Sequence, residues 1–225
     1  RGTQLWQKSQ LLESSGSEQV DVLQSSDVTS YGGGVEARER ENTVTLADYV
    51  EIITRQSGRD ESGNAIGEEA RSTRDTPYLI TRDKFPKVME GFEHLELFES
   101  FPRNRRERNE MALFMLGGHL SKTGFHFHSN TYNGLVFGSK HWYFLPPTSN
   151  LGHLQHPWFT YNDSKLSTEP HFSRYRPLEC VQHAGEVLFV PTGWKHAIVN
   201  HGVSVAMAIE VGDFSEAFPA AQQFF

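Results

Sequence analysis

The sequence predicts a mostly β protein, an antiparallel sandwich or barrel with a few flanking helices. Short β-rich runs punctuated by Gly, Pro, Asn or Ser fill the chain after Pro77, and no helical pattern separates them. Strand runs without intervening helices indicate antiparallel architecture. The 225 residues include 37% hydrophobic and 12% aromatic residues, enough for one large domain over 1–225.

Two short helices and one strand are expected before these runs. The segment from Leu5 to Leu12 has enough apolar residues for a helix, which Ser14-Ser15-Gly16 ends. Val20 and Val22 alternate as in a strand. From Thr45 to Thr54, apolar residues recur at helical spacing, which predicts the second helix.

Two stretches predict long loops. Residues 55–77 are rich in Gly, Ser and charge, which indicates a flexible insertion. Residues 148–176 combine Pro, His, Asn, Asp and Ser, and we expect a loop over one end of the barrel. The expected strands are Tyr78 to Thr81, Ala112 to Leu116, Leu135 to Phe137, Trp142 to Leu145, Val187 to Val190, Ala197 to Asn200 and Val203 to Ile209. The core of this barrel is expected to contain Trp142, Phe144, Phe189 and Trp194.

Composition excludes several classes of function. A net charge of −7 argues against a nucleic-acid partner and tolerates a basic peptide. The single cysteine, Cys180, allows no internal disulfide, no thiolate zinc finger and no iron–sulfur cluster, and we expect an inert buried thiol. Any metal must therefore be held by the 11 histidines or by carboxylates.

The sequence predicts no transmembrane segment, because no apolar run approaches the roughly 20 residues that span a bilayer. The chain begins at Arg1 without a charged-then-apolar leader, so we expect it to be truncated at its N-terminus.

Three histidines form a candidate metal site. In His126-Phe127-His128, residues two apart on a strand face the same side, so both imidazoles point one way. Far along the chain, a strand closed by Pro191 turns towards His196, which is a possible third ligand. Three neutral imidazoles with vacant coordination positions suit divalent iron, zinc, nickel or copper.

These histidines belong to an ordered set of motifs. H-x-H at 126–128 is followed by G-x-K-x-W at 138–142, with prolines at 146–147, and then by G-E-V-L-F-V-P-x-x-W-x-H at 185–196. The set resembles the JmjC and cupin-like branch of the iron(II)/2-oxoglutarate oxygenases, whose fold is a double-stranded β-helix, a jelly-roll. The resemblance is loose over 43–212 and specific over 123–147 and 177–200.

The resemblance implies roles for five residues. It implies iron(II) and 2-oxoglutarate as cofactors, and His126, His128 and His196 as the metal ligands. It further implies that Lys140 pairs with the far carboxylate of 2-oxoglutarate, because an ammonium ion matches a dicarboxylate tail, and that the Thr123 hydroxyl assists. No catalytic residue beyond the metal site is implied. The expected partner is a protein or peptide substrate.

One position departs from the family pattern. His128 stands where the family has Asp or Glu, as in a small JmjC subgroup of the endoplasmic reticulum lumen that this chain resembles most closely. A carboxylate ligand lowers the net charge at iron(II) and favours its oxidation, and neutral His128 does not.

Three functions therefore stay open. The leading interpretation is an iron(II)/2-oxoglutarate-dependent dioxygenase that hydroxylates a protein side chain. The second is a catalytically inactive JmjC-fold binding module, which the missing carboxylate supports. The third is a three-histidine thiol dioxygenase that does not use 2-oxoglutarate; Lys140 argues against it, because such an enzyme has no need of that cation.

Overall fold

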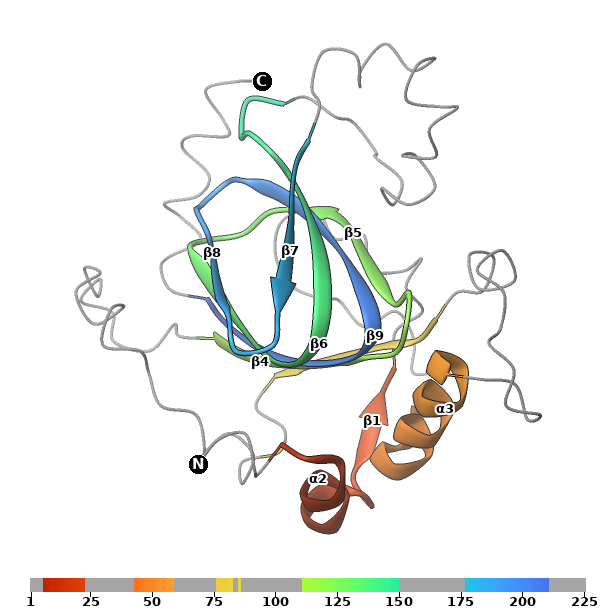
Figure 1. Cartoon of the computed structure of the whole chain (residues 1–225). Coiled ribbons are helices and arrows are strands. Elements are labelled where there is room, and N and C mark those ends of the chain that lie inside the picture. The colour runs from red at the N-terminus through yellow and green to blue at the C-terminus, as the bar shows by residue number, and fades with distance from the viewer. Residues whose placement is uncertain are drawn as a thin grey trace.

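The computed structural model describes residues 6–22, 43–58, 76–82, 85, 111–149 and 177–210 (Figure 1). In chain order the elements are α2 (Lys8–Ser15), β1 (Gln19–Asp21), β2 (Thr43–Thr45), α3 (Leu46–Gly58), β3 (Tyr78–Arg82), β4 (Met111–Gly117), β5 (Lys122–His126), β6 (Thr131–Leu145), β7 (Leu178–His183), β8 (Val187–Val190) and β9 (Lys195–Glu210). No helix among these residues is long and apolar enough to span a membrane.

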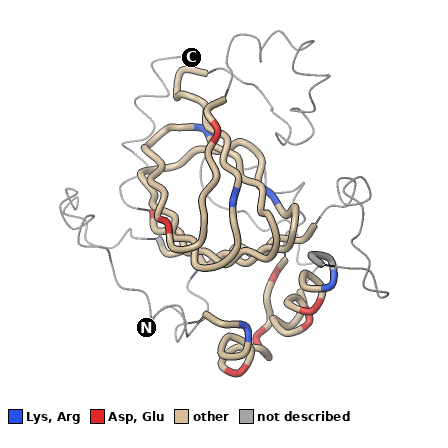
Figure 2. Tube along the Cα trace, viewed as in Figure 1, with Lys and Arg blue, Asp and Glu red and all other residues tan. Residues whose placement is uncertain are grey.

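Seven of the strands form one antiparallel sheet. Its strand order is β3-β4-β9-β6-β7, with β5 also paired to β9 and β8 also paired to β6. Figure 1 shows these strands curling around a common interior, while α2, α3 and β1 lie together at one side. The predicted fold class, mostly β and consistent with a cupin jelly-roll, is confirmed. Charged residues are sparse along the curled strands in Figure 2, as expected for strands that enclose a core.

The pairing of β6 with β9 forms the spine of the sheet. It runs from Thr131 opposite Glu210 to Leu145 opposite Lys195. The sequence predicts each of these strands as two shorter ones, because glycine is typical of strand ends. The structure shows that prediction to be wrong: Gly138 and Gly202 have positive φ values of 85° and 76°, and the chain shifts register there and continues as strand. A Cβ on Gly138 would overlap the carbonyl oxygen of Val203.

The helices differ from their predicted bounds. α2 begins at Lys8 rather than Leu5, and Leu5 lies outside the described residues. α3 starts as expected, because the Thr45 hydroxyl accepts a hydrogen bond from the Asp48 N–H at 3.1 Å. It continues to Gly58, so residues 55–58 are helical rather than part of the predicted insertion. Most of the two predicted loops, residues 59–75 and 150–176, lies outside the described residues.

The strand β7 was not predicted, and its side chains explain why. Among the described strands it pairs with β6 alone, at the end of the strand order, and most of its residues are exposed. Its sequence therefore shows no alternation of apolar and polar residues. Cys180 lies on this strand and is exposed, which corrects the expectation of a buried thiol. Among the aromatic residues expected in the core, Trp142 is buried, Phe144 and Trp194 pack partly buried against it, and Phe189 is 39% exposed.

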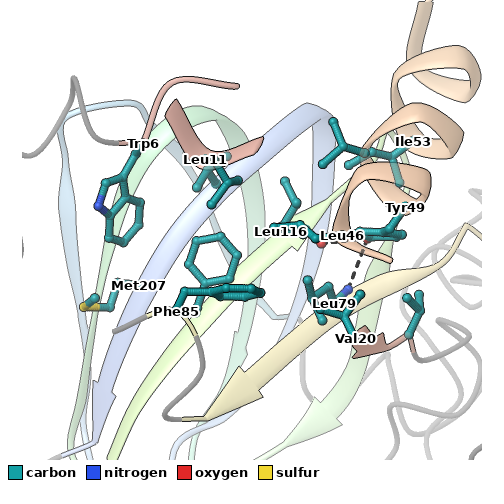
Figure 3. Packing of buried hydrophobic residues seen from close by; sticks show 14 of the residues in the cluster. Trp6, Leu11, Val20, Leu46, Tyr49, Ile53, Leu79, Phe85, Leu116 and Met207 are labelled. Carbon is teal, nitrogen blue, oxygen red and sulfur yellow. Dashed lines mark hydrogen bonds between the residues drawn. The ribbon is translucent and has the colours of Figure 1, made fainter. Parts of the chain in front are cut away.

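The helices pack on the outer face of the sheet through one apolar cluster. Figure 3 shows Leu46, Tyr49 and Ile53 of α3 facing Leu79 and Leu116 of β3 and β4. Burial of these apolar side chains stabilises the packing of the helices on the sheet, at about 25 cal/mol per Å² of apolar surface removed from water.

A single hydroxyl ties α3 to both strands. The fully buried Tyr49 hydroxyl donates to the Leu116 carbonyl at 2.7 Å and accepts from the Leu79 N–H at 3.1 Å. Burial raises the pKa of Tyr49 well above its usual value, so the hydroxyl keeps its proton.

We expect Tyr49→Phe to lower the free energy of unfolding by about 1–3 kcal/mol, because two buried backbone groups lose their partner. Glu51→Gln is the control on the same helix, since it removes only the exposed ion pair with Arg55 and should cost no more than about 0.5 kcal/mol. Denaturant unfolding of both variants measures the difference. An equal decrease in the free energy of unfolding for both variants would show that the hydrogen bonds of the Tyr49 hydroxyl do not stabilise the fold.

Candidate metal centre

A β-bulge in β5 sets the direction of the first histidine. Thr123 lies opposite Ile198 on β9, and His126 lies opposite His196, so one extra residue of β5 is accommodated between the two pairs. Residues directly opposite each other in an antiparallel pair present their side chains on the same face. The bulge therefore places both Thr123 and His126 on the face of His196, although they are three positions apart in the sequence.

The three predicted ligands converge. One candidate ligand nitrogen from each of His126, His128 and His196 lies within 4.8 Å of the others. The ring centroids of His126 and His128 lie 4.2 Å and 4.6 Å from that of His196. His128 follows the end of β5 rather than lying on it, so the expected strand alternation is not what aims its side chain.

Backbone carbonyls orient all three rings. Nδ1 of His126 lies 2.8 Å from the Gly124 carbonyl, Nδ1 of His128 lies 2.7 Å from the Ser129 carbonyl, and Nδ1 of His196 lies 3.1 Å from the Trp194 carbonyl. A carbonyl only accepts, so each Nδ1 carries the proton and each Nε2 keeps a free lone pair. This is the arrangement that metal-binding histidines use.

Electrostatics also favour neutral imidazoles. Burial, and then the neighbouring His128, lowers the pKa of His126 to about 4. Burial and the two other rings hold the pKa of His196 well below its usual value. At neutral pH both rings therefore offer lone pairs without having to release a proton.

Lys140 lies on the same inner face as the histidines. On the β6–β9 ladder Phe144 is opposite His196 and Lys140 is opposite Asn200, and these alternate positions share one face. The side chain of Lys140 is completely buried, and its Nζ donates to the Tyr78 hydroxyl at 2.8 Å. No carboxylate of the described residues forms an ion pair with it. A buried amine in this state fits an anionic ligand.

Several buried polar atoms of the interior have no hydrogen-bond partner among the described residues. They are Thr123 Oγ1, Asn133 Oδ1 and Asn200 Oδ1, besides Ser129 Oγ. Asn200 is opposite Lys140, and Asn133 reaches Met115 of the cluster that contains Tyr78. Buried polar groups are almost always satisfied, so unpaired ones in the interior that also holds a buried amine indicate room for a polar ligand.

Tyr78, Asn133 and Asn200 have no role predicted from the sequence. Asn133 and Asn200 could have been found as polar residues within otherwise apolar strand runs. Tyr78 gives no such signal, because its place beside Lys140 depends on β3 lying next to β4 in the sheet.

Comparisons with known proteins find several relatives by sequence. A bifunctional arginine demethylase and lysyl-hydroxylase of Caenorhabditis briggsae is 26% identical over 183 residues, covering 67% of this chain and 46% of that protein. An arginine-specific demethylase of Arabidopsis thaliana is 29% identical over 136 residues, covering 56% of this chain and 29% of that protein. JmjC domain-containing protein 8 of Homo sapiens is 35% identical over 170 residues, covering 73% of this chain and 57% of that protein.

The matched region thus covers about half or less of the nematode and plant proteins named above. The sequence model of the cupin-like domain family matches residues 1–210, nearly the whole chain. With its antiparallel sheet and its three-histidine cluster, this chain belongs to the JmjC and cupin-like domain family.

Proposed function

We propose that this protein binds iron(II) and 2-oxoglutarate and hydroxylates a side chain of a protein or peptide. The observation that carries the proposal is the presence, on one inner face, of three imidazoles with free Nε2 atoms and a buried amine without a carboxylate partner among the described residues. The first group suits a divalent cation, and the second suits a carboxylate.

Each residue has a defined task in this proposal. His126, His128 and His196 would hold the metal through Nε2, with Nδ1 fixed by backbone carbonyls. Lys140 and the Tyr78 hydroxyl would bind the far carboxylate of 2-oxoglutarate, and Thr123 would donate a further hydrogen bond. Bound iron and 2-oxoglutarate would supply the oxidising chemistry with dioxygen as the oxidant: one oxygen atom enters the C–H bond of the substrate, and the other enters the succinate formed as 2-oxoglutarate loses CO2.

A protein substrate is supported by the relatives. The nematode and plant proteins are named for activities on arginine and lysyl residues. The net charge of −7 also tolerates a basic peptide.

A catalytically inactive binding module is the second candidate, and His128 favours it. Three neutral ligands leave the full charge of the cation uncompensated in the ligand set, which makes oxidised states harder to reach. A thiol dioxygenase is less well supported, because a small thiol substrate gives no reason to bury Lys140 beside the site.

We expect metal binding to resist mild acid. Three ordinary imidazoles would lose roughly a thousandfold in apparent affinity per pH unit below about 6.5, because each must give up a proton. His126 and His196 are already neutral there, so the loss should be at most roughly tenfold per unit. Calorimetric titration of Co(II) at pH 7.0, 6.0 and 5.5 measures it. A steep loss between pH 6.0 and 5.5 contradicts the assignment of these rings.

We expect Lys140→Met to weaken 2-oxoglutarate binding about 5- to 150-fold, the equivalent of losing a hydrogen bond to a charged group. Met keeps the length of the side chain without its charge. The control is Lys122→Met: Lys122 is also buried, but it lies opposite Val199 and so faces away from the histidines. Titration of the metal-loaded proteins compares them. Unchanged affinity for 2-oxoglutarate in the Lys140→Met protein would contradict a role for Lys140 in binding it.

We expect slow or absent 2-oxoglutarate turnover in the parent and faster turnover in His128→Asp, because a carboxylate ligand stabilises the oxidised metal. His128→Asn is the matched control, since it has the size of Asp without the charge. Succinate formation by the iron-loaded proteins is the measurement. Robust turnover by the parent would show that three histidines suffice. No turnover by any of them, with metal and cosubstrate bound, would favour the binding module.

A further inference from the structure

A buried carboxylate lies beside the His128 side of the candidate metal centre, and the proposed function gives it no task. Glu210 ends β9, and only 7% of its surface is exposed. Its Oε1 accepts a hydrogen bond from the Ser129 N–H at 3.2 Å, the amide that directly follows His128.

Hydrogen bonds connect this carboxylate to the His128 ring through a short segment of β6 and the turn before it. Glu210 lies opposite Thr131 on the β6–β9 ladder. The Thr131 hydroxyl lies 3.0 Å from Nδ1 of His128 and donates to the Ser129 carbonyl at 3.1 Å. The same carbonyl accepts from the His128 ring at 2.7 Å. The orientation of His128 and the position of Glu210 therefore depend on one another.

Glu210 has no cationic partner in the part of the chain that the structure describes. The ion pairs found there join Glu51 to Arg55 and Glu179 to His141, and both involve surface-accessible carboxylates. A buried carboxylate held by one amide donor is costly unless a positive charge lies near it. The cation that three neutral imidazoles would hold is such a charge.

We propose that Glu210 supplies, from outside the ligand set, the negative charge that His128 does not bring to the metal. The inference rests on the proposed metal site. Glu210 does not join the cluster of nitrogens within 4.8 Å, so it is a positioning and charge-compensating residue rather than a ligand. A charge in this place acts through a poorly screened interior, and it stabilises the bound cation without occupying a coordination position.

The test is Co(II) binding by the full chain, measured by competition with a chelator. Glu210→Gln keeps the shape and the acceptor for the Ser129 N–H but removes the charge, and we expect at least a tenfold loss of affinity. The absorption bands of bound Co(II) should stay in place, because the three ligands are unchanged. Glu210→Asp keeps the charge and should retain affinity to within about threefold.

Glu186→Gln is the matched control. Glu186 also accepts a backbone hydrogen bond, from the His183 N–H at 2.7 Å, but it is exposed in the turn between β7 and β8. Its substitution should leave the affinity unchanged.

A double-mutant cycle separates charge from structure. If Glu210 replaces the missing ligand charge, Glu210→Gln should cost at least tenfold in the parent and less than threefold in the His128→Asp background, where a carboxylate already coordinates. An equal loss in both backgrounds means that Glu210 is merely structural and overturns the inference.

The remaining outcomes are also decisive. Co(II) binding by the parent with no loss in Glu210→Gln overturns this inference and leaves the metal site intact. A parent that binds no Co(II) overturns the proposed function, and the inference with it. Should Glu210→Gln fail to fold, Glu210→Ala and Glu210→Asp are compared: at least a tenfold loss of affinity in Glu210→Ala with retained affinity in Glu210→Asp supports a role for the charge, and equal affinities of the two variants overturn it.

Discussion

The register between β6 and β9 is the constraint on which the rest of this structure depends. Every other strand of the large sheet except β3 pairs with one of these two, and β3 joins through β4. Because opposite residues share a face, the register alone puts Lys140 on the inner face with His196. A slip by one residue would turn Lys140 outward and bring apolar neighbours such as Leu145 towards the interior. The same register therefore determines both which apolar side chains are buried in the barrel and which polar side chains reach the site.

The irregular places in these strands are where the site is built. The bulge in β5 brings Thr123 and His126 to one face, which a regular strand would not do. The register shifts of β6 at Gly138 lie two residues before Lys140. Bulges bend a strand and change the direction of its side chains, so a barrel wall can present groups from several strands to one point.

The part of the site that could be predicted lies in short sequence motifs. H-x-H and the distal W-x-H name the three histidines from nearby sequence, and the structure brings them together. Thr123 was reached by resemblance alone, since strand alternation places it on the wrong face and a bulge leaves no mark in the sequence. Tyr78 and Glu210 could not be found this way. Their roles depend on contacts with residues more than sixty positions away.

In the fold, too, the features set by neighbouring residues could be predicted, and those set by a distant partner strand could not. The order of the apolar runs indicated an antiparallel sheet, because a strand and its turn are local features. Whether Gly138 and Gly202 end a strand or bend it depends on the partner strand, so the two longest strands were each predicted as two. The exposed strand β7 was missed because burial, and not strand formation, is what produces apolar alternation.

Charge balance explains how binding and catalysis can separate at such a site. In the family pattern, a divalent metal and an ammonium ion are balanced by the two carboxylates of 2-oxoglutarate and one carboxylate ligand. In this chain the three candidate ligands are neutral, and the third carboxylate would be that of Glu210, outside the coordination sphere. The sum of charges would be the same in both arrangements, so we expect the site to keep part of the affinity for the metal and the dianion that a carboxylate ligand gives. Donation of electron density to the metal requires direct coordination. The Glu210 carboxylate, which is hydrogen-bonded to the Ser129 N–H and lies outside the ligand cluster, cannot supply it. We therefore expect binding to depend on the summed charge of the site, and redox activity to depend on the residue at the position of His128.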